Sequence, residues 1–414
     1  MSNIFFYKGK ENILEKKNKE SVDNEEIKKI QETFLKILDN KNLSFLLGSG
    51  CSSYKIEKEQ IGIPTMEPMA EEFYSMSDFK EDKKWLLDVL KMNVDDENFK
   101  TNLEAFLSVL HSLSFYHSKI KNDDNTSKKI NGIIINARNF ILQKCLNEEN
   151  IKDKKDEDLL EVYKTFYKKL LTRNPTLPRL NIFTTNYDLY SERAMDTLGI
   201  HYVNGFTGGI SKYFNPTIFN YAFAEKMDLS QSKWNVIDNF FYLYKIHGSV
   251  NWIENDDEGK LFKIQEIQDP TFEKLKDKES IMIHPTPLKY NASLGSPYSD
   301  LFREFQKKLM QNNNILVTIG YSFSDEHINN LIFQAFTIPS FRLIIIGTEK
   351  QSEAIQKLHS LNDSRIWIIG GYDEKERPLH YFKGFVEKIL PDLTNEDLDK
   401  KLEATINNLK DLLK

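Results

Sequence analysis

The sequence contains only two cysteines, Cys51 and Cys145, among its 414 residues. Two cysteines cannot form the disulfide framework of a small secreted domain, and without a Cys-x-x-Cys pair they cannot supply a structural zinc site. No apolar run approaches the roughly 18–20 residues that a membrane-spanning helix needs. The first residues also lack the apolar stretch of a signal peptide. These absences predict a cytoplasmic protein.

The motifs of several enzyme classes are missing as well. The sequence has no His-Glu-x-x-His zinc motif, no Gly-x-Ser-x-Gly nucleophile elbow and no Gly-x4-Gly-Lys-Ser/Thr phosphate loop. Its net charge of −6 provides no overall basic surface, so we expect no sequence-specific nucleic-acid binding. Hydrophobic residues make up 40% of the chain, which excludes disorder of the whole and allows two or three compact units.

What the sequence does contain is a change of pattern along the chain. Apolar residues recur at helical spacing at 25–38, in several segments between 66 and 178, and near the end. After residue 178, short β-type runs alternate with helical patterns; they are residues 180–185, 241–246, 280–285, 315–320, 343–347 and 366–371. Buried strands flanked by helices are typical of an α/β fold with a doubly wound parallel sheet.

The strand-like run 43–47 is expected to join the same sheet, which makes 66–178 a large inserted helical module in a Rossmann-like fold. The predicted units are an N-terminal tail and helix (1–42), a Rossmann-like domain (43–65 and 179–390), the helical insertion (66–178) and a C-terminal helix (391–414). Residues 1–20 are mostly charged, and we expect them to form a mobile or partner-bound tail.

A turn of small residues follows the first predicted strand. The segment FLLGSGCSS (residues 45–53) changes from apolar residues to Gly48, Ser49 and Gly50. Without a Cβ, glycine lets backbone N–H groups approach a pyrophosphate. The third glycine of the Gly-x-Gly-x-x-Gly pattern is missing because Ser53 occupies its position. A plain strand-to-helix turn is therefore an equally good interpretation of this motif alone.

Small or polar residues also follow four later strands. They include Asn186 and Asp188, His247, Ser322 and Gly347. Each has a structural alternative, because Asn, Asp and Ser often cap helices and a single histidine is more often structural than catalytic. Together they predict a site, since ligands of parallel sheets bind at the carboxyl ends of the strands. A neutral imidazole at His247 would serve there as a general base near neutral pH.

The order of these motifs resembles the sirtuin family. The segments that carry the resemblance are GSGCS (48–52), GIP (62–64), TTNYD (184–188), IHG (246–248) and GYSFSD (320–325). The resemblance spans about residues 43–350, and TTNYD with IHG is its most specific part. It implies a Rossmann-type domain that binds NAD+ in a cleft and breaks the bond between nicotinamide and ribose.

The resemblance also implies roles for individual residues. Asn186 and His247 would be catalytic, with His247 as the base at the ribose hydroxyls. The implied NAD+-binding residues are Gly48, Ser49, Gly50, Ser52, Pro64, Asp188, Gly320, Ser322 and Gly347. Nicotinamide leaves from a cationic ring, so the reaction needs orientation, a dry pocket and one base, and we expect no metal.

Three departures separate the chain from the deacylases of that family. The four zinc cysteines are absent, Thr65-Met66-Glu67 replaces Asp-Phe-Arg after GIP, and residues 66–178 have no counterpart. Zinc-free sirtuin-like chains with helical insertions resemble bacterial antiphage effectors that hydrolyse NAD+, including a type that assembles with a HerA-type ATPase.

We therefore expect an NAD+ glycohydrolase that depletes NAD+ in abortive infection, a homo-oligomer, and a HerA-type ATPase as partner. The alternatives are a lysine deacylase or ADP-ribosyltransferase, and a non-catalytic NAD- or ADP-ribose-binding assembly subunit. The likeness of GIP to the cofactor loop of sirtuins also predicts a lid at Gly62–Met76, with Met66, Met69 and Phe73 over the nicotinamide end.

Overall fold

The protein is described by a computed structural model that covers residues 3–14, 22–56, 59–148, 157–225, 236–237, 239–254, 263–276, 278, 280–282 and 295–392. The C-terminal helix predicted at 391–414 lies outside these residues from 393 onward.

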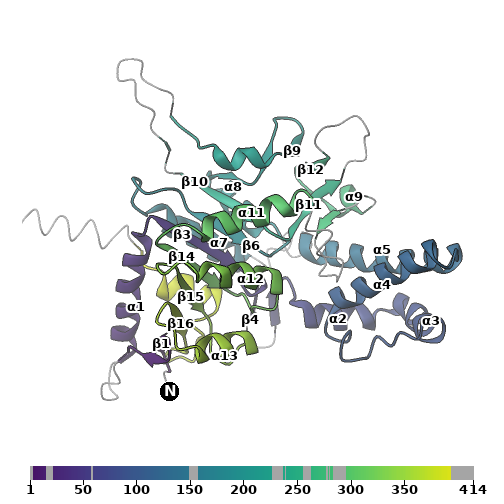
Figure 1. The fold of residues 1–414 in the computed structure, drawn as a ribbon, viewed down its shortest axis with the longest axis horizontal. Helices are drawn as coiled ribbons and strands as arrows, with labels where there is room; N and C mark the ends of the chain where they lie inside the picture. Colours follow the sequence, from purple (N-terminus) through teal and green to yellow (C-terminus); the bar gives the residue numbers. More distant parts are fainter. Residues whose placement is uncertain are drawn as a thin grey trace, which may run out of the picture.

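A nine-stranded sheet, counted over the described residues, forms the centre of the molecule (Figure 1). Its strand order is β2-β1-β16-β15-β14-β3-β6-β10-β7, and the strands from β16 to β7 run parallel. Their bounds are β1 Phe5–Lys8, β2 Glu11–Asn12, β3 Asn42–Leu47, β6 Asn181–Thr184, β7 His201–Val203, β10 Phe240–Lys245, β14 Asn314–Ile319, β15 Arg342–Ile346 and β16 Ile366–Gly370. The predicted α/β fold with a large parallel sheet is confirmed.

Helices cover both faces of this sheet, which explains why its strands are almost continuously apolar. One face packs against α1 (Val22–Leu38), α7 (Glu157–Leu171), α8 (Tyr190–Leu198) and α14 (Phe382–Gly384), the other against α11 (Tyr298–Leu309), α12 (Glu326–Ala335) and α13 (Glu353–Ser360). Along β3, Phe45 and Leu47 join the first core and Leu46 joins the second, as the alternation of side chains in a strand requires.

The order of the strands creates a switch point beside β3. The chain enters the parallel part of the sheet at β3, adds β6 and β10 on one side, and later adds β14, β15 and β16 on the other. Connections from β3 and β14 therefore diverge to opposite sides of the sheet, and the crevice between them is where ligands of such folds bind.

Two parts of the sheet differ from the sequence prediction. Residues 5–8, predicted to lie in a tail, form β1 and pair antiparallel with β16, because the apolar Phe5 and Phe6 are buried there. Residues 280–282, predicted to lie in the main sheet, form β13 of a second sheet. That antiparallel sheet consists of β8 Phe206–Thr207, β9 Lys212–Phe214, β11 Gly248–Glu254, β12 Ile264–Glu266 and β13 Ser280–Met282.

Four helices of the insertion extend sideways from the sheet (Figure 1). They are α2 Met66–Ser75, α3 Lys80–Leu90, α4 Leu103–Lys119 and α5 Asp124–Leu146, and we call them the helical module. A hairpin of β4 (Ser53–Ile56) and β5 (Glu59–Gly62) leads into them, and the short α9 (Phe272–Leu275) touches α5.

Aromatic side chains form the core of the helical module. Phe73 is 2% exposed and contacts the rings of Tyr74, Phe79, Phe106 and Phe140. The expectation that Phe73 covers the nicotinamide end is therefore wrong, since this ring is enclosed by others of the module.

The helix α7 was grouped with the insertion but contacts the main sheet. Phe166 packs edge-to-face on Phe45 of β3, and Tyr167 packs on Phe241 of β10, with ring centroids 5.6 and 5.2 Å apart. The boundaries of the predicted domains themselves stay a prediction.

Candidate active site

Four neighbouring strands end at the same level of the sheet. Leu47 of β3 is in register with Ile319 of β14 and with Thr184 of β6, and Thr184 is in register with Lys245 of β10. The segments that follow these strands consequently leave the sheet side by side, although Leu47 and Ile319 are 272 residues apart in the sequence. This register is what brings the separate sequence motifs together.

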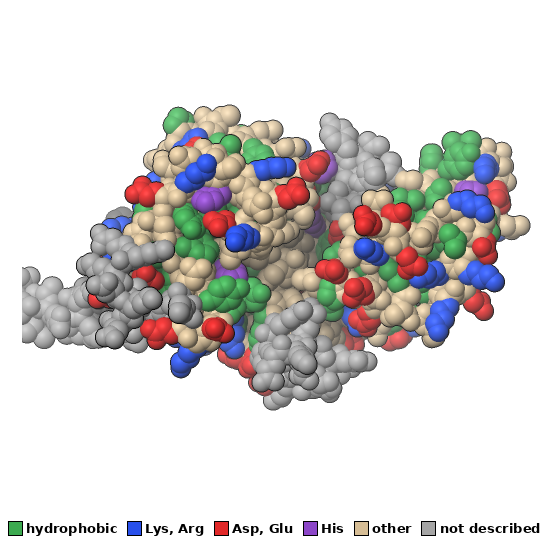
Figure 2. Space-filling view, turned by 90° about the horizontal axis from the view of Figure 1, so that it is seen from below, with side chains coloured by type: hydrophobic (Ala, Val, Ile, Leu, Met, Phe, Trp, Pro, Cys, Tyr) green, Lys and Arg blue, Asp and Glu red, His purple; other side chains and the backbone are tan. Residues whose placement is uncertain are grey.

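A cavity of about 320 Å³ lies at these strand ends, between them and the helical module. Figure 2 shows the surface hollowed between the sheet-containing part of the molecule and the module. Eight of the predicted site residues line the cavity: Ser49, Ser52, Pro64, Asn186, Asp188, His247, Gly320 and Ser322. Both predicted catalytic residues are among them.

Three predicted binding residues do not line the cavity. Gly48 and Gly50 pack against the turn after β14. A Cβ on Gly48 would lie 2.4 Å from the carbonyl oxygen of Gly320, and a Cβ on Gly50 would lie 2.9 Å from the Cα of Gly320. Gly347 follows β15, where a Cβ would meet the Gln351 side chain. The small residues at 48–50 are thus required by the close approach of two backbone segments.

The backbone N–H groups of the same turn are largely engaged within the protein. Gly48 N donates to Ile319 O and Gly50 N to Gly320 O, while Cys51 N and Ser52 N donate to the carbonyls of residues 48 and 49. A ligand phosphate would therefore depend on the Ser49 N–H and on the nearby hydroxyls of Ser49, Ser322 and Ser324, all three of which line the cavity.

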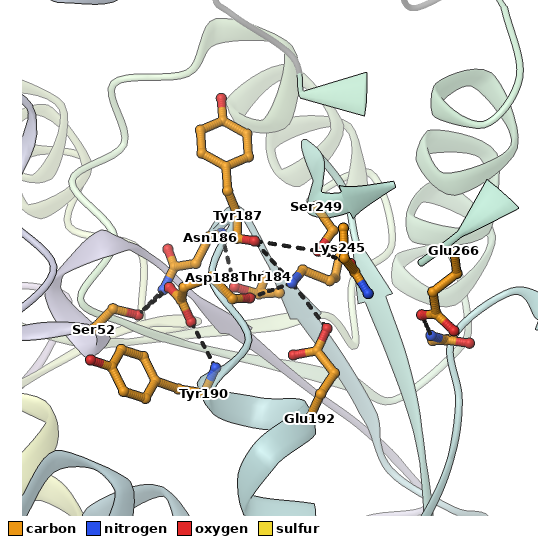
Figure 3. A network of polar contacts seen from close by, with 12 residues as sticks. Ser52, Thr184, Asn186, Tyr187, Asp188, Tyr190, Glu192, Lys245, Ser249 and Glu266 are labelled. Carbon is orange, nitrogen blue, oxygen red and sulfur yellow. Dashed lines mark hydrogen bonds and ion pairs between the residues drawn. The ribbon is translucent and has the colours of Figure 1, made fainter. Parts of the chain in front are cut away.

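Asn186 is held by two hydrogen bonds of its side-chain amide. Its Nδ2 donates to the carbonyl of Gly48 at 2.9 Å and to Ser52 Oγ at 2.8 Å (Figure 3). Ser52 Oγ in turn donates to Asp188 Oδ2 at 2.6 Å, and Asp188 Oδ1 accepts from Tyr190 N. These bonds fix the positions of both Asn186 and Asp188 at the cavity wall.

A lysine lies behind the same turn. Lys245 Nζ is 2.9 Å from Glu192 Oε1 and also donates to the backbone carbonyls of Tyr187 and Asp188 (Figure 3). Burial raises the pKa of Glu192, and the neighbouring Lys245 opposes that increase. Neither Lys245 nor Glu192 lines the cavity.

His247 approaches the carboxylate of a helix cap. Its Nε2 is 3.0 Å from Asp325 Oδ2, and Asp325 Oδ1 accepts from the N–H groups of His327 and Ile328 at the start of α12. Both side chains line the cavity. A carboxylate beside an imidazole orients the ring and stabilises its protonated form, which suits a general base.

Tyr187 and Glu104 form another part of the wall. The Tyr187 hydroxyl is 3.5 Å from Glu104 Oε1, and the Tyr187 ring centroid is 6.5 Å from that of His247. Burial, with the nearby Glu104 carboxylate, raises the pKa of the Tyr187 hydroxyl well above its ordinary value. The helical module thus contributes an ionisable side chain, Glu104 of α4, to the cavity.

Sequence reasoning assigned no role to Lys245, Tyr187 or Glu104 and included Asp325 only as the last residue of the motif GYSFSD. Tyr187 lies inside the motif TTNYD and Lys245 directly precedes IHG, so their positions were a usable signal. Glu104 had none, because its approach to the cavity depends on how the helical module folds. Cys145 also lines the cavity, but burial raises the pKa of its thiol, which keeps it uncharged.

Two features are absent from the described part of the chain. Within that part of the chain, no group of three or more His, Cys, Asp or Glu side chains is arranged to hold a metal ion. None of the helices described there is long and apolar enough to cross a membrane.

The fold and the cavity together define a Rossmann-like α/β protein with a candidate ligand site at the switch point of its sheet. Residues 180–366 match the family described as the SIR2-like domain, which supports a sirtuin-like family for this chain and implies the use of NAD+. The match includes Asn186, Asp188, His247 and Ser322 and leaves out the turn at 48–52. No curated protein matches the chain.

Proposed function

We propose that this protein is an NAD+ glycohydrolase, which uses water to cleave the nicotinamide–ribose bond and releases nicotinamide and ADP-ribose. The observation that carries the proposal is that Asn186 and His247, from the ends of adjacent strands, line one cavity inside the SIR2-like match. A protein that only binds nucleotide needs no imidazole with a carboxylate partner at this place.

The proposed reaction balances with one base. The bond between C1′ of the ribose and the ring nitrogen breaks, and its electron pair leaves with nicotinamide, which becomes neutral. The oxygen of a water molecule bonds to C1′, and the proton released passes to His247 and then to solvent. Asn186 would orient the water or a ribose hydroxyl, with its Nδ2 already held by Gly48 and Ser52.

The charges at the cavity support one orientation of the substrate. The lining includes the carboxylates of Glu104, Asp188 and Asp325, and no Lys or Arg is among the described residues that line it. Carboxylates favour the cationic nicotinamide ring and the oxocarbenium-like ribose of the transition state. The pyrophosphate would lie toward the serine hydroxyls after β3 and β14.

The biological setting forms part of the proposal and rests on the resemblance described above. It comprises depletion of NAD+ in antiphage defence, a homo-oligomer and a HerA-type ATPase partner. Exposed apolar side chains on the outer helices support assembly through the helical module: Leu87, Val89, Phe115, Tyr116, Ile120 and Ile135. A cytoplasmic location belongs to the same proposal.

The deciding experiment incubates the purified chain with NAD+, with and without an acetylated lysine peptide. We expect nicotinamide and ADP-ribose in equal amounts at a rate that the peptide does not change. Nicotinamide release only with peptide would instead identify a deacylase, and transfer of ADP-ribose to protein a transferase. Binding of ADP-ribose without any cleavage would identify an assembly subunit.

A further inference from the structure

A buried ion pair lies directly behind the turn that carries Asn186 and Asp188. Lys245 is 1% exposed and Glu192 is 7% exposed, and their charged atoms are 2.9 Å apart. Lys245 is the last residue of β10, and Glu192 is in the first turn of α8. The pair therefore joins the sheet to the helix that follows the turn.

Lys245 also holds the turn itself. Its Nζ donates to the backbone carbonyl of Tyr187 at 3.3 Å and to that of Asp188. The carbonyl of Tyr187 receives two further bonds from β11, from Val250 N at 3.1 Å and from Ser249 Oγ at 3.3 Å. The three donors of the ammonium group thus have three acceptors, two of which belong to the turn (Figure 3).

The pair is poorly suited to a purely stabilising role. Glu192 Oε2 is buried and accepts no hydrogen bond within the described part of the chain. Removing two charges from water is costly, and replacing such a pair with apolar residues is often neutral or stabilising. A costly pair placed behind the two candidate site residues is better explained by the geometry that it imposes on them.

We propose that Lys245 is a positioning residue for the reaction. Through the carbonyls of Tyr187 and Asp188 it sets the conformation of the turn, so that Asn186 and Asp188 face the cavity, and Glu192 keeps its ammonium group in place. The catalytic consequence rests on the proposed function, whereas the effect on the turn can be measured without it.

The test replaces the pair by apolar residues of similar volume, Lys245→Met with Glu192→Leu, in the full chain. The control is Lys129→Met with Asp82→Asn, which removes an ion pair of the helical module distant from the turn. Hydrogen exchange is measured for residues 184–190, which include the N–H groups of Asn186 and Tyr190 that bond to Thr184 Oγ1 and Asp188 Oδ1. Release of nicotinamide from NAD+ is measured in parallel.

We expect exchange at 184–190 to become at least about 10-fold faster in the Lys245/Glu192 variant, with the other strands of the sheet unchanged. Both kcat and kcat/KM should fall about 100-fold, because small displacements of aligned groups have effects of that size. The control should match the wild type in both measurements. Wild-type exchange and wild-type kcat in the Lys245/Glu192 variant would overturn the proposal.

The two hypotheses can fail separately. If the wild type does not cleave NAD+ but the variant shows faster exchange at the turn, the proposed function is wrong and the effect of Lys245 on the turn stands. If the wild type cleaves NAD+ and the variant keeps wild-type exchange, Lys245 does not position the turn.

A second comparison applies if the apolar variant does not fold. Glu192→Gln leaves the ammonium charge without its partner, so the variant should be less stable overall. It keeps a hydrogen-bond acceptor of the same shape, so Lys245 can still reach the two carbonyls, and exchange at 184–190 relative to the other strands of the sheet should stay within about threefold of the wild type. Adding Lys245→Gln to this variant shortens the side chain and removes the ammonium donors. Exchange at 184–190 should then become roughly 10-fold faster than in the wild type. Equal exchange in these two variants would contradict a role of Lys245 in holding the turn.

Discussion

The imidazole of His247 and the carboxylate of Asp325 are 3.0 Å apart, and that carboxylate also caps helix α12. The cap bonds leave Asp325 little freedom, because its Oδ1 accepts from two backbone N–H groups. The residue that caps α12 is therefore also placed to orient the candidate base. Its two roles can be separated by substitution.

Replacing Asp325 by Asn should keep the cap and remove the charge. Asn is as good an N-cap as Asp, so the free energy of unfolding should change by less than about 0.5 kcal/mol. Without the carboxylate partner the imidazole is no longer held in one orientation, so kcat should fall roughly 10- to 100-fold. An unchanged kcat in a variant of wild-type stability would show that Asp325 serves only as a cap.

Replacing Asn186 by Ala should affect both catalysis and stability. The structure shows a buried amide whose Nδ2 donates to Gly48 O and to Ser52 Oγ. Both acceptors keep another partner, Cys51 N for Gly48 O and the Tyr163 hydroxyl for Ser52 Oγ. The loss of two buried hydrogen bonds should still cost about 1–3 kcal/mol in chemical denaturation, at about 0.5–1.5 kcal/mol each. NAD+ cleavage should fall by about 10²-fold or more. Unchanged stability together with lost cleavage would mean that the two bonds contribute little.

Replacing Gly48 by Ala tests the close approach of the two turns. The added Cβ would lie 2.4 Å from the Gly320 carbonyl oxygen, and overpacking of this kind costs about 1–3 kcal/mol. The matched control is Gly132→Ala in α5, where no atom lies within 4 Å of the new Cβ. In a helix interior that change should stabilise by about 0.5–1 kcal/mol. The unfolding temperature should therefore fall for Gly48→Ala and rise for Gly132→Ala. A shift of both in the same direction would count against the close approach of the two turns.

His380 should make stability depend on pH. Burial lowers the pKa of His380, although its contact with the Gly371 carbonyl opposes the change. Below about pH 6.5 the unfolded chain binds a proton at this residue that the folded chain does not, so stability is present above that pH and decreases as the pH falls. The free energy of unfolding, measured with urea at several pH values between 5 and 8, should rise less steeply with pH for His380→Gln than for the wild type. The same pH dependence of stability in both proteins would contradict a buried His380 with a lowered pKa.

The main sheet was predictable because parallel strands covered on both faces are apolar along their whole length. The runs at 43–47, 315–320 and 343–347 show this and correspond to β3, β14 and β15. The site motifs were predictable as well, because polar residues directly after such runs converge at one edge of the sheet.

Other features could not be predicted because they depend on contacts between distant segments. Lys245 and Glu192 are 53 residues apart, and a charged side chain in a sequence is ordinarily expected at the surface. The strands of the second sheet are mostly two or three residues long, which is too short for a periodic pattern to show. The entry of Glu104 into the cavity depends on the orientation of a whole helix.

The most direct test of the proposed site is a rate of nicotinamide release measured without any peptide, for the wild type and for His247→Ala. His247 lines the cavity and is the only base that the proposed reaction requires. We expect the wild type to release nicotinamide and ADP-ribose in equal amounts and His247→Ala to do so about 10²–10⁴-fold more slowly, with an unchanged unfolding temperature. Near-normal release by a folded His247→Ala variant would contradict the assignment of this cavity as an NAD+-hydrolysing active site.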